Sequence, residues 1–258
     1  MLLNYIIGPA GSGKSTLVAN IKEYVLNRDS EINVITINLD PGAINVEYNP
    51  EIDIRDYITL EEVMTKYKLG PNGAIILASD LMINFIEDIK YEIGQYQPDW
   101  VFIDTAGQLE LFAFRDVGPI IASSLGFGDV QRSTTFLFDS HMARRPNGFI
   151  STSLLAASVQ YRFINIPQIN ALSKSDLLEE EILDMIIEWS SDFQALSEAT
   201  NEREKGLIRE LSLLLSEVFS KMGSTSELIP ITTMREDGLE YLFATLQRIF
   251  DSDKSEFY

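Results

Sequence analysis

The stretch that decides the fold of this chain is Gly8-Pro9-Ala10-Gly11-Ser12-Gly13-Lys14-Ser15. It matches G-x-x-x-x-G-K-[ST], in which backbone N–H groups surround a β-phosphate, the lysine reaches the β- and γ-phosphates, and the hydroxyl faces Mg²⁺. An apolar run at Leu3–Ile7 precedes it, and a helical pattern at Ser15–Asn27 follows. The sequence therefore predicts a phosphate-binding loop between a strand and a helix, with these nucleotide-binding residues: Gly11, Ser12, Gly13, Lys14, Ser15 and Thr16.

Beyond this loop, short apolar runs alternate with longer helix-like segments, a pattern typical of βα units and a parallel sheet. We expect further strands at Val34–Leu39, Trp100–Asp104, Thr134–Asp139, Gln168–Leu172 and Leu228–Thr232, and further helices at Asp80–Gln95, Leu109–Leu125 and Gly148–Tyr161. The fold class is predicted to be α/β, with a mostly parallel sheet and helices on both of its faces.

The region from Leu177 to Met222 departs from this rhythm, because it carries no strand pattern. It reads as two long amphipathic helices, Glu179–Ala199 and Glu202–Lys221. Apolar residues recur at helical spacing on the second helix, and a place in the core explains them more readily than a surface for a partner: Leu207, Leu211, Leu214, Leu215 and Val218. We expect one domain over residues 1–258 with a helical insertion, a candidate lid, at about 177–222.

Composition excludes several classes of function. The net charge is −19, which argues against broad binding to nucleic acid or to an anionic membrane. The chain has no cysteine and a single histidine, His141, so thiolate chemistry and histidine-rich metal centres are excluded. Neither a membrane span nor a signal peptide is recognisable, and we expect a cytoplasmic protein with no membrane partner. His141 itself is more readily structural than catalytic.

Two aspartates follow predicted strands and are candidates for the phosphate side of the site. Asp104 ends an apolar strand in the sequence D-T-A-G-Q, where a ligand of Mg²⁺ or of its water belongs, and Gly107 leaves an N–H free for the γ-phosphate. Asp40 follows the second strand and precedes Pro41-Gly42. A turn-forming role and a functional role are about equally supported for Asp40 by its position alone.

The stretch Asn170–Asp176 follows another strand and has the form of the N-K-x-D loop that reads guanine. The Asp176 carboxylate can accept hydrogen bonds from guanine N1 and N2, which adenine does not offer, while Lys174 packs its stem along the base. Ser173 stands where the pattern has asparagine. Ser175 or Asp176 can alternatively cap a helix, and both roles are compatible. Thr232-Thr233-Met234 matches the S-A-K element of GTPases poorly.

The tripeptide Gly70-Pro71-Asn72, taken alone, predicts a turn. Taken in order with the other elements, it gives the chain a resemblance to the GPN-loop GTPases. The similarity runs through the phosphate loop, N-L-D-P, G-P-N-G, D-T-A-G-Q-x-E, S-K-x-D and the D-G-L-x-x-L at Asp237–Leu242. It covers nearly the whole chain. Pro9 stands where dimeric ATPases with a signature lysine carry that lysine, so that branch loses support.

The resemblance implies a homodimeric GTPase that converts GTP to GDP and phosphate and acts as a conformational switch. The loop Gly70, Pro71 and Asn72 of one subunit would enter the site of the other, where Asn72 stabilises the transferred phosphoryl group. It further implies a metal site for Mg²⁺ at Ser15, Asp40 and Asp104, and catalytic roles for Asn72, Asp40, Gln108, Glu110 and Lys14. RNA polymerase or another large assembly is the implied client.

Two other functions remain open at this point. An ATP-dependent P-loop kinase would need an acceptor pocket and a basic lid, and the region from Leu177 to Met222 is not strongly basic. A regulatory module that holds nucleotide with little hydrolysis is the second alternative, and the intact phosphate-side elements argue against it. No arginine is placed at the γ-phosphate by a motif, which fits a catalytic group supplied by a second subunit.

Overall fold

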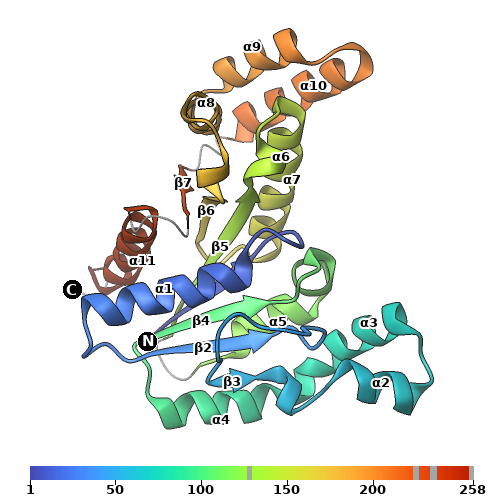
Figure 1. Cartoon of the computed structure of the whole chain (residues 1–258), viewed down its shortest axis with the longest axis vertical. Helices are drawn as coiled ribbons and strands as arrows, with labels where there is room; N and C mark the ends of the chain where they lie inside the picture. Colours follow the sequence, from blue (N-terminus) through green and yellow to red (C-terminus); the bar gives the residue numbers. More distant parts are fainter. Residues whose placement is uncertain (127–129, 223–226, 233–236, 256–258) are drawn as a thin grey trace.

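The computed structural model describes residues 1–126, 130–222, 227–232 and 237–255. In this part of the chain a seven-stranded sheet, parallel at every pairing, has the strand order β3-β2-β4-β1-β5-β6-β7 (Figure 1). The six predicted strands are all present: β1 (Leu2–Ile7), β2 (Val34–Leu39), β4 (Trp100–Thr105), β5 (Gln131–Asp139), β6 (Gln168–Ser173) and β7 (Leu228–Pro230). Strand β3 (Ile52–Asp53) was not predicted, because two residues are too short to show a periodicity.

Helices cover both faces of the sheet, as predicted. On one face α1 (Lys14–Arg28) and α11 (Asp237–Ser255) pack Ile21 and Phe243 against strand residues that include Trp100, and the ring of Trp100 stacks on that of Phe102. The other face is covered by α4 (Ile86–Tyr96), α5 (Val117–Ser124) and α7 (Pro146–Arg162). The strands are therefore buried on both sides, which explains their continuous apolar sequences.

Two of the predicted helices are interrupted. The segment predicted as Leu109–Leu125 is a short π-helix, η3 (Glu110–Phe114), followed by α5, and Arg115 between them has an extended backbone with φ −94° and ψ 160°. The segment predicted as Asp80–Gln95 is the end of α3 (Pro71–Leu81), a 3₁₀ turn η2 (Met82–Phe85), and α4. In the first case Arg115 leaves the helix to pair with Asp80 on α3, a tertiary contact that the helical pattern alone does not reveal.

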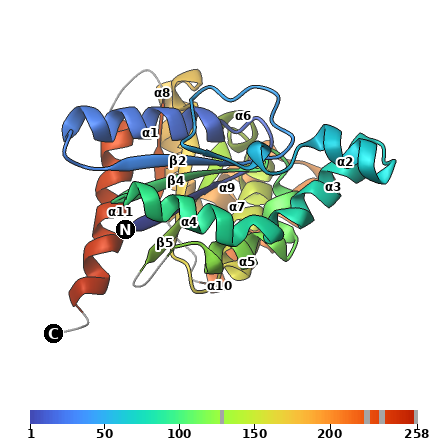
Figure 2. The same cartoon turned by 90° about the horizontal axis from the view of Figure 1, so that it is seen from below.

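A helical hairpin is inserted between β3 and β4. It consists of the 3₁₀ turn η1 (Ile54–Asp56), α2 (Leu60–Tyr67) and α3 (Pro71–Leu81). A capping box between Thr59 and Glu62 starts α2, and Lys68 ends it in the left-handed conformation. Pro71 occupies the first turn of α3, where its missing N–H costs nothing. Figures 1 and 2 show α2 and α3 projecting away from the sheet.

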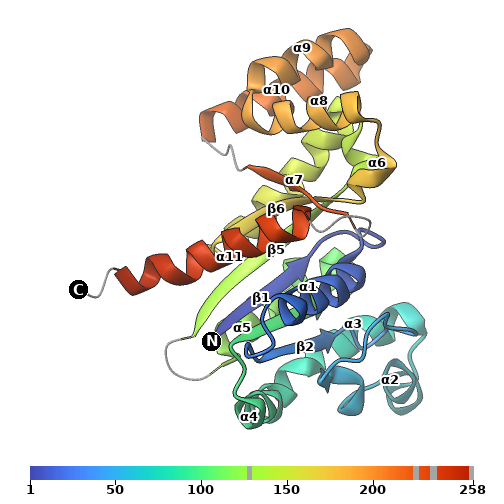
Figure 3. The ribbon, with the colours of Figure 1, turned by 60° about the vertical axis from the view of Figure 1, so that its left-hand side comes forward.

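The predicted insertion contains three helices where two were expected. They are α8 (Glu180–Ser191), α9 (Phe193–Arg203) and α10 (Gly206–Met222). Asp192 breaks the first predicted helix, because its carboxylate accepts a hydrogen bond from the backbone N–H of Gln194 and caps α9. The three helices lie together at one end of the molecule, beyond α7 and the four-residue helix α6 (Ser140–Ala143) (Figure 3).

The interpretation of the α10 leucines as core residues was wrong. Exposure is 78% for Leu207, 54% for Leu211, 62% for Leu214 and 48% for Val218, and of the predicted set Leu215 alone is partly buried against the core. The buried face of α10 instead carries Ser212 and Ser216, which are small enough for close packing on neighbouring helices and 5% and 4% exposed. Helical spacing identified an apolar face correctly but not the side toward which it turns.

No helix among the described ranges is both long enough and apolar enough to span a membrane.

Candidate nucleotide-binding site

The predicted phosphate and base residues gather along one edge of the sheet, where the parallel strands end. Asp104 of β4 lies beside Ile6 of β1 on one side and beside Asn38 of β2 on the other. Further along, Asp139 of β5 pairs with Ser173 of β6. The loops that follow these strands therefore meet at the carboxyl ends, which is where ligands bind in open α/β sheets.

The phosphate loop has the backbone geometry that its glycines predict. Gly11 and Gly13 have φ values of 74° and 88°, and Gly13 caps the start of α1. The Lys14 ammonium folds back over the loop, donating to the carbonyls of Gly8 and Pro9 at 3.0 Å each and toward that of Gly107 at 3.4 Å. Burial lowers the pKa of Lys14, and the charges of Asp104 and Asp40 oppose this effect.

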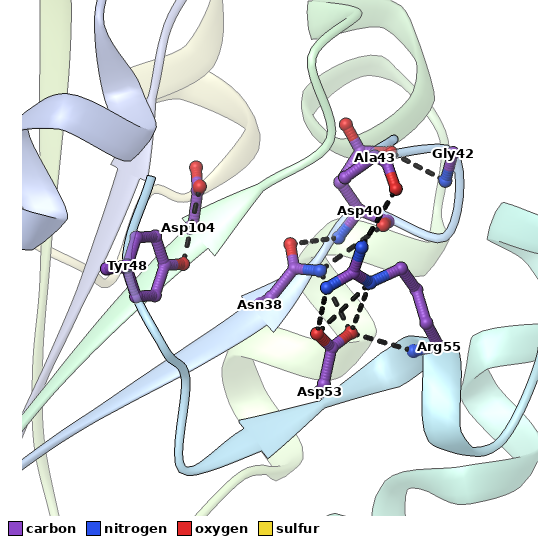
Figure 4. Close-up of polar contacts among 8 residues, drawn as sticks. All are labelled: Asn38, Asp40, Gly42, Ala43, Tyr48, Asp53, Arg55 and Asp104. Carbon is purple, nitrogen blue, oxygen red and sulfur yellow. Dashed lines mark hydrogen bonds and ion pairs between the residues drawn. The ribbon is translucent and has the colours of Figure 1, made fainter. Parts of the chain in front are cut away.

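Asp104 is a buried carboxylate with one unsatisfied oxygen. Its Oδ2 accepts a hydrogen bond from the Tyr48 hydroxyl at 3.3 Å, whereas its Oδ1 has no hydrogen-bond partner among the described residues (Figure 4). Burial raises its pKa to about 6, although hydrogen bonding to Ser15 and the charge of Lys14 act in the opposite direction. An orphaned buried carboxylate oxygen beside a serine hydroxyl fits the donor set for Mg²⁺.

The donors available for Mg²⁺ are few. In the described ranges no three His, Cys, Asp or Glu side chains gather into a group that could enclose an ion. In nucleotide sites one or two carboxylates and hydroxyls share Mg²⁺ with phosphates and water. Ser15 and Asp104 are the residues that would hold it, and the predicted role of Asp40 as a third ligand stays a prediction.

Asp40 forms a turn and also links two loops of the site. Its Oδ1 accepts from the Gly42 N–H at 2.9 Å, which confirms the turn-forming role. Its Oδ2 accepts from the Gly107 N–H at 2.8 Å, so the same carboxylate joins the loop after β2 to the loop after β4. The turn thus places the carboxylate at the phosphate-side loop, and the functional role of Asp40 stays a prediction.

A polar network behind Asp40 was missed by sequence reasoning (Figure 4). Asn38 accepts from the Asp40 N–H at 3.0 Å and donates to Asp53 at 3.0 Å, and Arg55 binds both Asp53 and the carbonyl of Ala43. The one signal in the sequence is the pair of opposite charges in Asp53-Ile54-Arg55. That signal is weak, because it depends on the two-residue strand β3 pairing with β2.

The predicted base-reading residues line a pocket of about 190 Å³ beside α1, formed in part by Thr16, Lys174, Asp176 and Thr232. Asp176 accepts a hydrogen bond from the Thr232 hydroxyl at 2.6 Å. The helix-cap interpretation was wrong, since Lys174 precedes the 3₁₀ turn η4 (Ser175–Leu177) and Glu179 precedes α8.

The residues flanking Asp176 have partners of their own. Ser173, which stands in place of asparagine, is buried and donates to the carbonyl of Phe138 at 3.1 Å. Lys174 donates to the carbonyl of Gly11 and to Asp139, so its stem crosses toward the phosphate loop. The pocket therefore joins the base-reading loop to the phosphate loop, with Asp176 at its side.

Several candidates lie outside this cluster. Gly70, Pro71 and Asn72 are exposed at the turn between α2 and α3, the far end of the projecting hairpin (Figures 1 and 2). Gln108 and Glu110 are exposed before and at the start of η3, and in the described part of the chain neither side chain bonds Asp40 or Asp104. His141 is also exposed, on α6. Thr233 and Met234 lie outside the described residues.

This site defines the class of P-loop nucleotide-binding proteins. Its elements are the strand, the glycine loop and the helix around Lys14, together with Asp104 at the carboxyl end of the neighbouring strand. A family model described as "Conserved hypothetical ATP binding protein" matches residues 6–252. GPN-loop GTPase 3 of Dictyostelium discoideum is 31% identical over 255 residues, which cover 96% of this chain and 85% of that protein. The chain belongs to the GPN-loop GTPase family.

Further comparisons agree with this assignment. GPN-loop GTPase 1 of Dictyostelium discoideum is 30% identical over 243 residues, which are 92% of this chain and 59% of that longer protein. The crystal structure of a GTPase from Pyrococcus abyssi in its apo form superposes with a TM-score of 0.82 at 25% identity, over 96% of this chain and 97% of that one. The α/β P-loop fold and the family therefore rest on both sequence and structure.

Proposed function

We propose that this chain is a Mg²⁺-dependent enzyme that hydrolyses GTP to GDP and phosphate and works as a homodimer. One observation carries the proposal: a single sheet edge brings together the phosphate loop, the carboxylates Asp104 and Asp40, and the base-pocket carboxylate Asp176. In this proposal residues 1–258 form one domain, and residues at about 177–222 are a helical insertion into it.

Recognition of the nucleotide follows from the chemistry of the two ends of the site. Lys14 and the N–H groups of the phosphate loop bind the β- and γ-phosphates, and Lys14 exchanges its carbonyl partners for phosphate oxygens. Asp176 accepts hydrogen bonds from guanine N1 and N2, whereas adenine would leave this carboxylate unpaired. Ser15, Asp40 and Asp104 would hold Mg²⁺, which would supply positive charge to the phosphates when bound.

The contact between Asp40 and Gly107 supports a role for both loops in hydrolysis. Both backbone groups of Gly107 have partners: its N–H donates to Asp40, and its carbonyl accepts from Lys14. A γ-phosphate that accepts from the Gly107 N–H competes with Asp40 for this donor. The freed Asp40 carboxylate then accepts a hydrogen bond from the attacking water, with Gln108 and Glu110 as further groups that orient this water.

The projecting hairpin supports catalysis across a dimer. Asn72 is exposed at its far end, in the first turn of α3. In the proposal this loop enters the site of a second copy, and the Asn72 amide donates to the phosphoryl group in flight. An amide is neutral, so its contribution is smaller than that of an arginine.

The proposed cycle and partners extend the family assignment. GTP closes the dimer, hydrolysis relaxes it, and the insertion helices α8–α10 move with this change. A large assembly such as RNA polymerase is the proposed client, the cytoplasm is the proposed compartment, and neither nucleic acid nor membrane is expected as a partner. The net charge of −19 is consistent with a protein client, since polyanions are repelled.

Replacing Asn72 with Ala tests the central step. Turnover of GTP is expected to fall sharply while GTP affinity stays near wild type, because the amide acts in the transition state. Asn201→Ala is the matched control, since Asn201 is an exposed asparagine on α9 whose side-chain amide donates to the carbonyl of Ser197, one turn earlier in the same helix. Unchanged turnover in Asn72→Ala, or a persistent monomer by mass measurement with GTP, would contradict catalysis across the dimer.

A mixing experiment separates action in trans from action within one chain. Lys14→Ala chains keep Asn72 and lack the phosphate-binding lysine, whereas Asn72→Ala chains have the reverse defect. An equal mixture is expected to recover about a quarter of wild-type turnover, because half of the dimers hold one complete site. Competition between GTP and ATP, followed by phosphate release without an acceptor, distinguishes this enzyme from an ATP-dependent kinase and from a module that only holds nucleotide.

A further inference from the structure

Arg55 contacts the turn that carries Asp40 at one end directly and is linked to its other end through Asp53. On the far side of the turn, the Arg55 Nη1 donates to the carbonyl of Ala43 at 3.0 Å. On the near side, the same guanidinium binds Asp53 through Nε at 2.9 and 3.0 Å and through Nη2 at 2.5 Å. Figure 4 shows the guanidinium lying between Asp53 and the turn.

Asp53 transmits this contact to the backbone of Asp40. It lies beside Asn38 in the pairing of β3 with β2, and its Oδ1 accepts from the Asn38 side-chain amide at 3.0 Å. The Asn38 Oδ1 in turn accepts from the Asp40 N–H at 3.0 Å. The chain of contacts therefore runs from Arg55 through two side chains to the residue whose carboxylate holds Gly107.

The chemistry of arginine suits this position, and its charge is already neutralised there. The planar guanidinium presents five donors in a fixed fork, so one side chain can bind a carboxylate and a separate carbonyl together. The pKa of Asp53 is lowered overall: burial acts to raise it, but hydrogen bonds from Arg55 and Asn38 outweigh that effect. Because Arg55 is paired with Asp53, it is not a free cation for a phosphate.

We propose that Arg55 is a positioning residue for GTP hydrolysis. Through Asp53, Asn38 and the Ala43 carbonyl it fixes the backbone of the turn that carries Asp40, and with it the place from which the Asp40 carboxylate acts. This inference rests on the proposed catalytic role of Asp40. Partners that orient a functional group from behind typically change activity by about 10-fold to 100-fold when lost. Since Arg55 touches neither phosphate loop nor base pocket, its loss lowers kcat and leaves KM for GTP nearly unchanged.

The test compares Arg55→Lys with Arg162→Lys in the full-length protein. A lysine keeps the charge of Arg55 but has no fork with which to span Asp53 and Ala43. Arg162, the last residue of α7, is a matched control. Its side chain is 33% exposed, against 30% for Arg55, and it also pairs with an aspartate, Asp116. We expect kcat to fall about 10-fold to 100-fold in Arg55→Lys, with KM within about 2-fold and no change in Arg162→Lys. Asp53→Asn is expected to act like Arg55→Lys and serves as the test if Arg55→Lys does not fold.

The double variant Arg55→Lys/Asp40→Asn shows whether Arg55 acts through Asp40. If it does, the double variant turns over GTP no more slowly than Asp40→Asn alone. Provided that Asp40→Asn is impaired, three results overturn the inference. The first is a wild-type kcat in both Arg55→Lys and Asp53→Asn. The second is a double variant whose kcat falls by the product of the two single losses, and the third is an effect of Arg55→Lys on KM in place of kcat. Wild-type turnover in Asp40→Asn instead overturns the proposed role of Asp40 in hydrolysis, and with it the reason for a positioning role of Arg55.

Discussion

Replacing Asp104 with Asn is expected to stabilise the protein when neither nucleotide nor metal is bound. Asp104 is buried at the phosphate end of the sheet, and one of its oxygens has no hydrogen-bond partner among the described residues. Its pKa is raised from the ordinary value of 3.8 to about 6, mainly by burial. The ionised carboxylate is thus disfavoured in the folded state, where Mg²⁺ would otherwise compensate for its charge.

The magnitude follows from the difference between the two pKa values. The folded protein binds the Asp104 proton more tightly than the unfolded chain, because the folded-state pKa is the higher one. The contribution of this proton to the free energy of unfolding is therefore fully present below pH 3.8. This contribution is lost as the pH rises through about 6. A difference of about 2 between the two pKa values corresponds to about 3 kcal/mol in the free energy of unfolding, or about 6 to 12 °C in Tm for a chain of this size. Asn is neutral like the protonated acid. The loss of attraction between Asp104 and Lys14 is therefore already contained in this figure, because the charge of Lys14 contributes to the pKa of Asp104.

The assay is urea unfolding of wild type and Asp104→Asn in EDTA, from pH 4 to pH 8. The variant should be more stable by about 3 kcal/mol at pH 7 to 8, and this advantage should vanish toward pH 4. The same variant is expected to lose Mg²⁺-dependent GTP turnover, which shows that stability and activity change in opposite directions at this position. Equal or lower stability of Asp104→Asn at pH 7.5, or a difference that does not vary with pH, would refute the reasoning.

Two further predictions concern the base pocket and the insertion. Thr232→Val removes the 2.6 Å hydrogen bond that orients Asp176. In a competition titration the binding free energy of GTP should weaken by about 1 kcal/mol, while the weak binding of ATP stays unchanged. An equal loss for both nucleotides would contradict a role of Asp176 in reading guanine. Leu211→Gln on the exposed face of α10 should change the free energy of unfolding by no more than about 0.5 kcal/mol. Leu246→Ala, at a fully buried position, should cost about 2 to 5 kcal/mol, and a similar cost at Leu211 would show that α10 is covered.

The strands and the phosphate loop could be predicted because their signals are local. Continuous apolar runs such as Val34–Leu39 report burial on both faces, and the predicted bounds agree with the structure there. The breaks at Arg115 and Asp192 were missed, because a tertiary ion pair and a cap outweigh helical periodicity at those residues. Strand β3 escaped prediction because two residues give no period.

The candidate site divides in the same way. The aspartates at strand ends could be named in advance, since parallel strands bring their carboxyl ends to one edge. The partners of these aspartates could not, because the contact of Asp40 with Gly107 joins residues 67 positions apart and depends on β2 lying beside β4. The contact of Tyr48 with Asp104 likewise joins the loop between β2 and β3 to the strand β4, 56 positions further along the chain.

By itself the sequence determined that this protein has a P-loop fold and belongs among nucleotide-binding enzymes, because residues 8–15 encode their geometry within a single strand–turn–helix unit. The tertiary structure decided what surrounds that unit. It leaves one oxygen of Asp104 without a partner among the described residues, brings Arg55 to the turn that carries Asp40, and exposes the α10 leucines. The physical reason is the range of the contacts. A loop that is contiguous in sequence fixes its own backbone, whereas burial and hydrogen-bond partners depend on strand order and on which helix face meets the core.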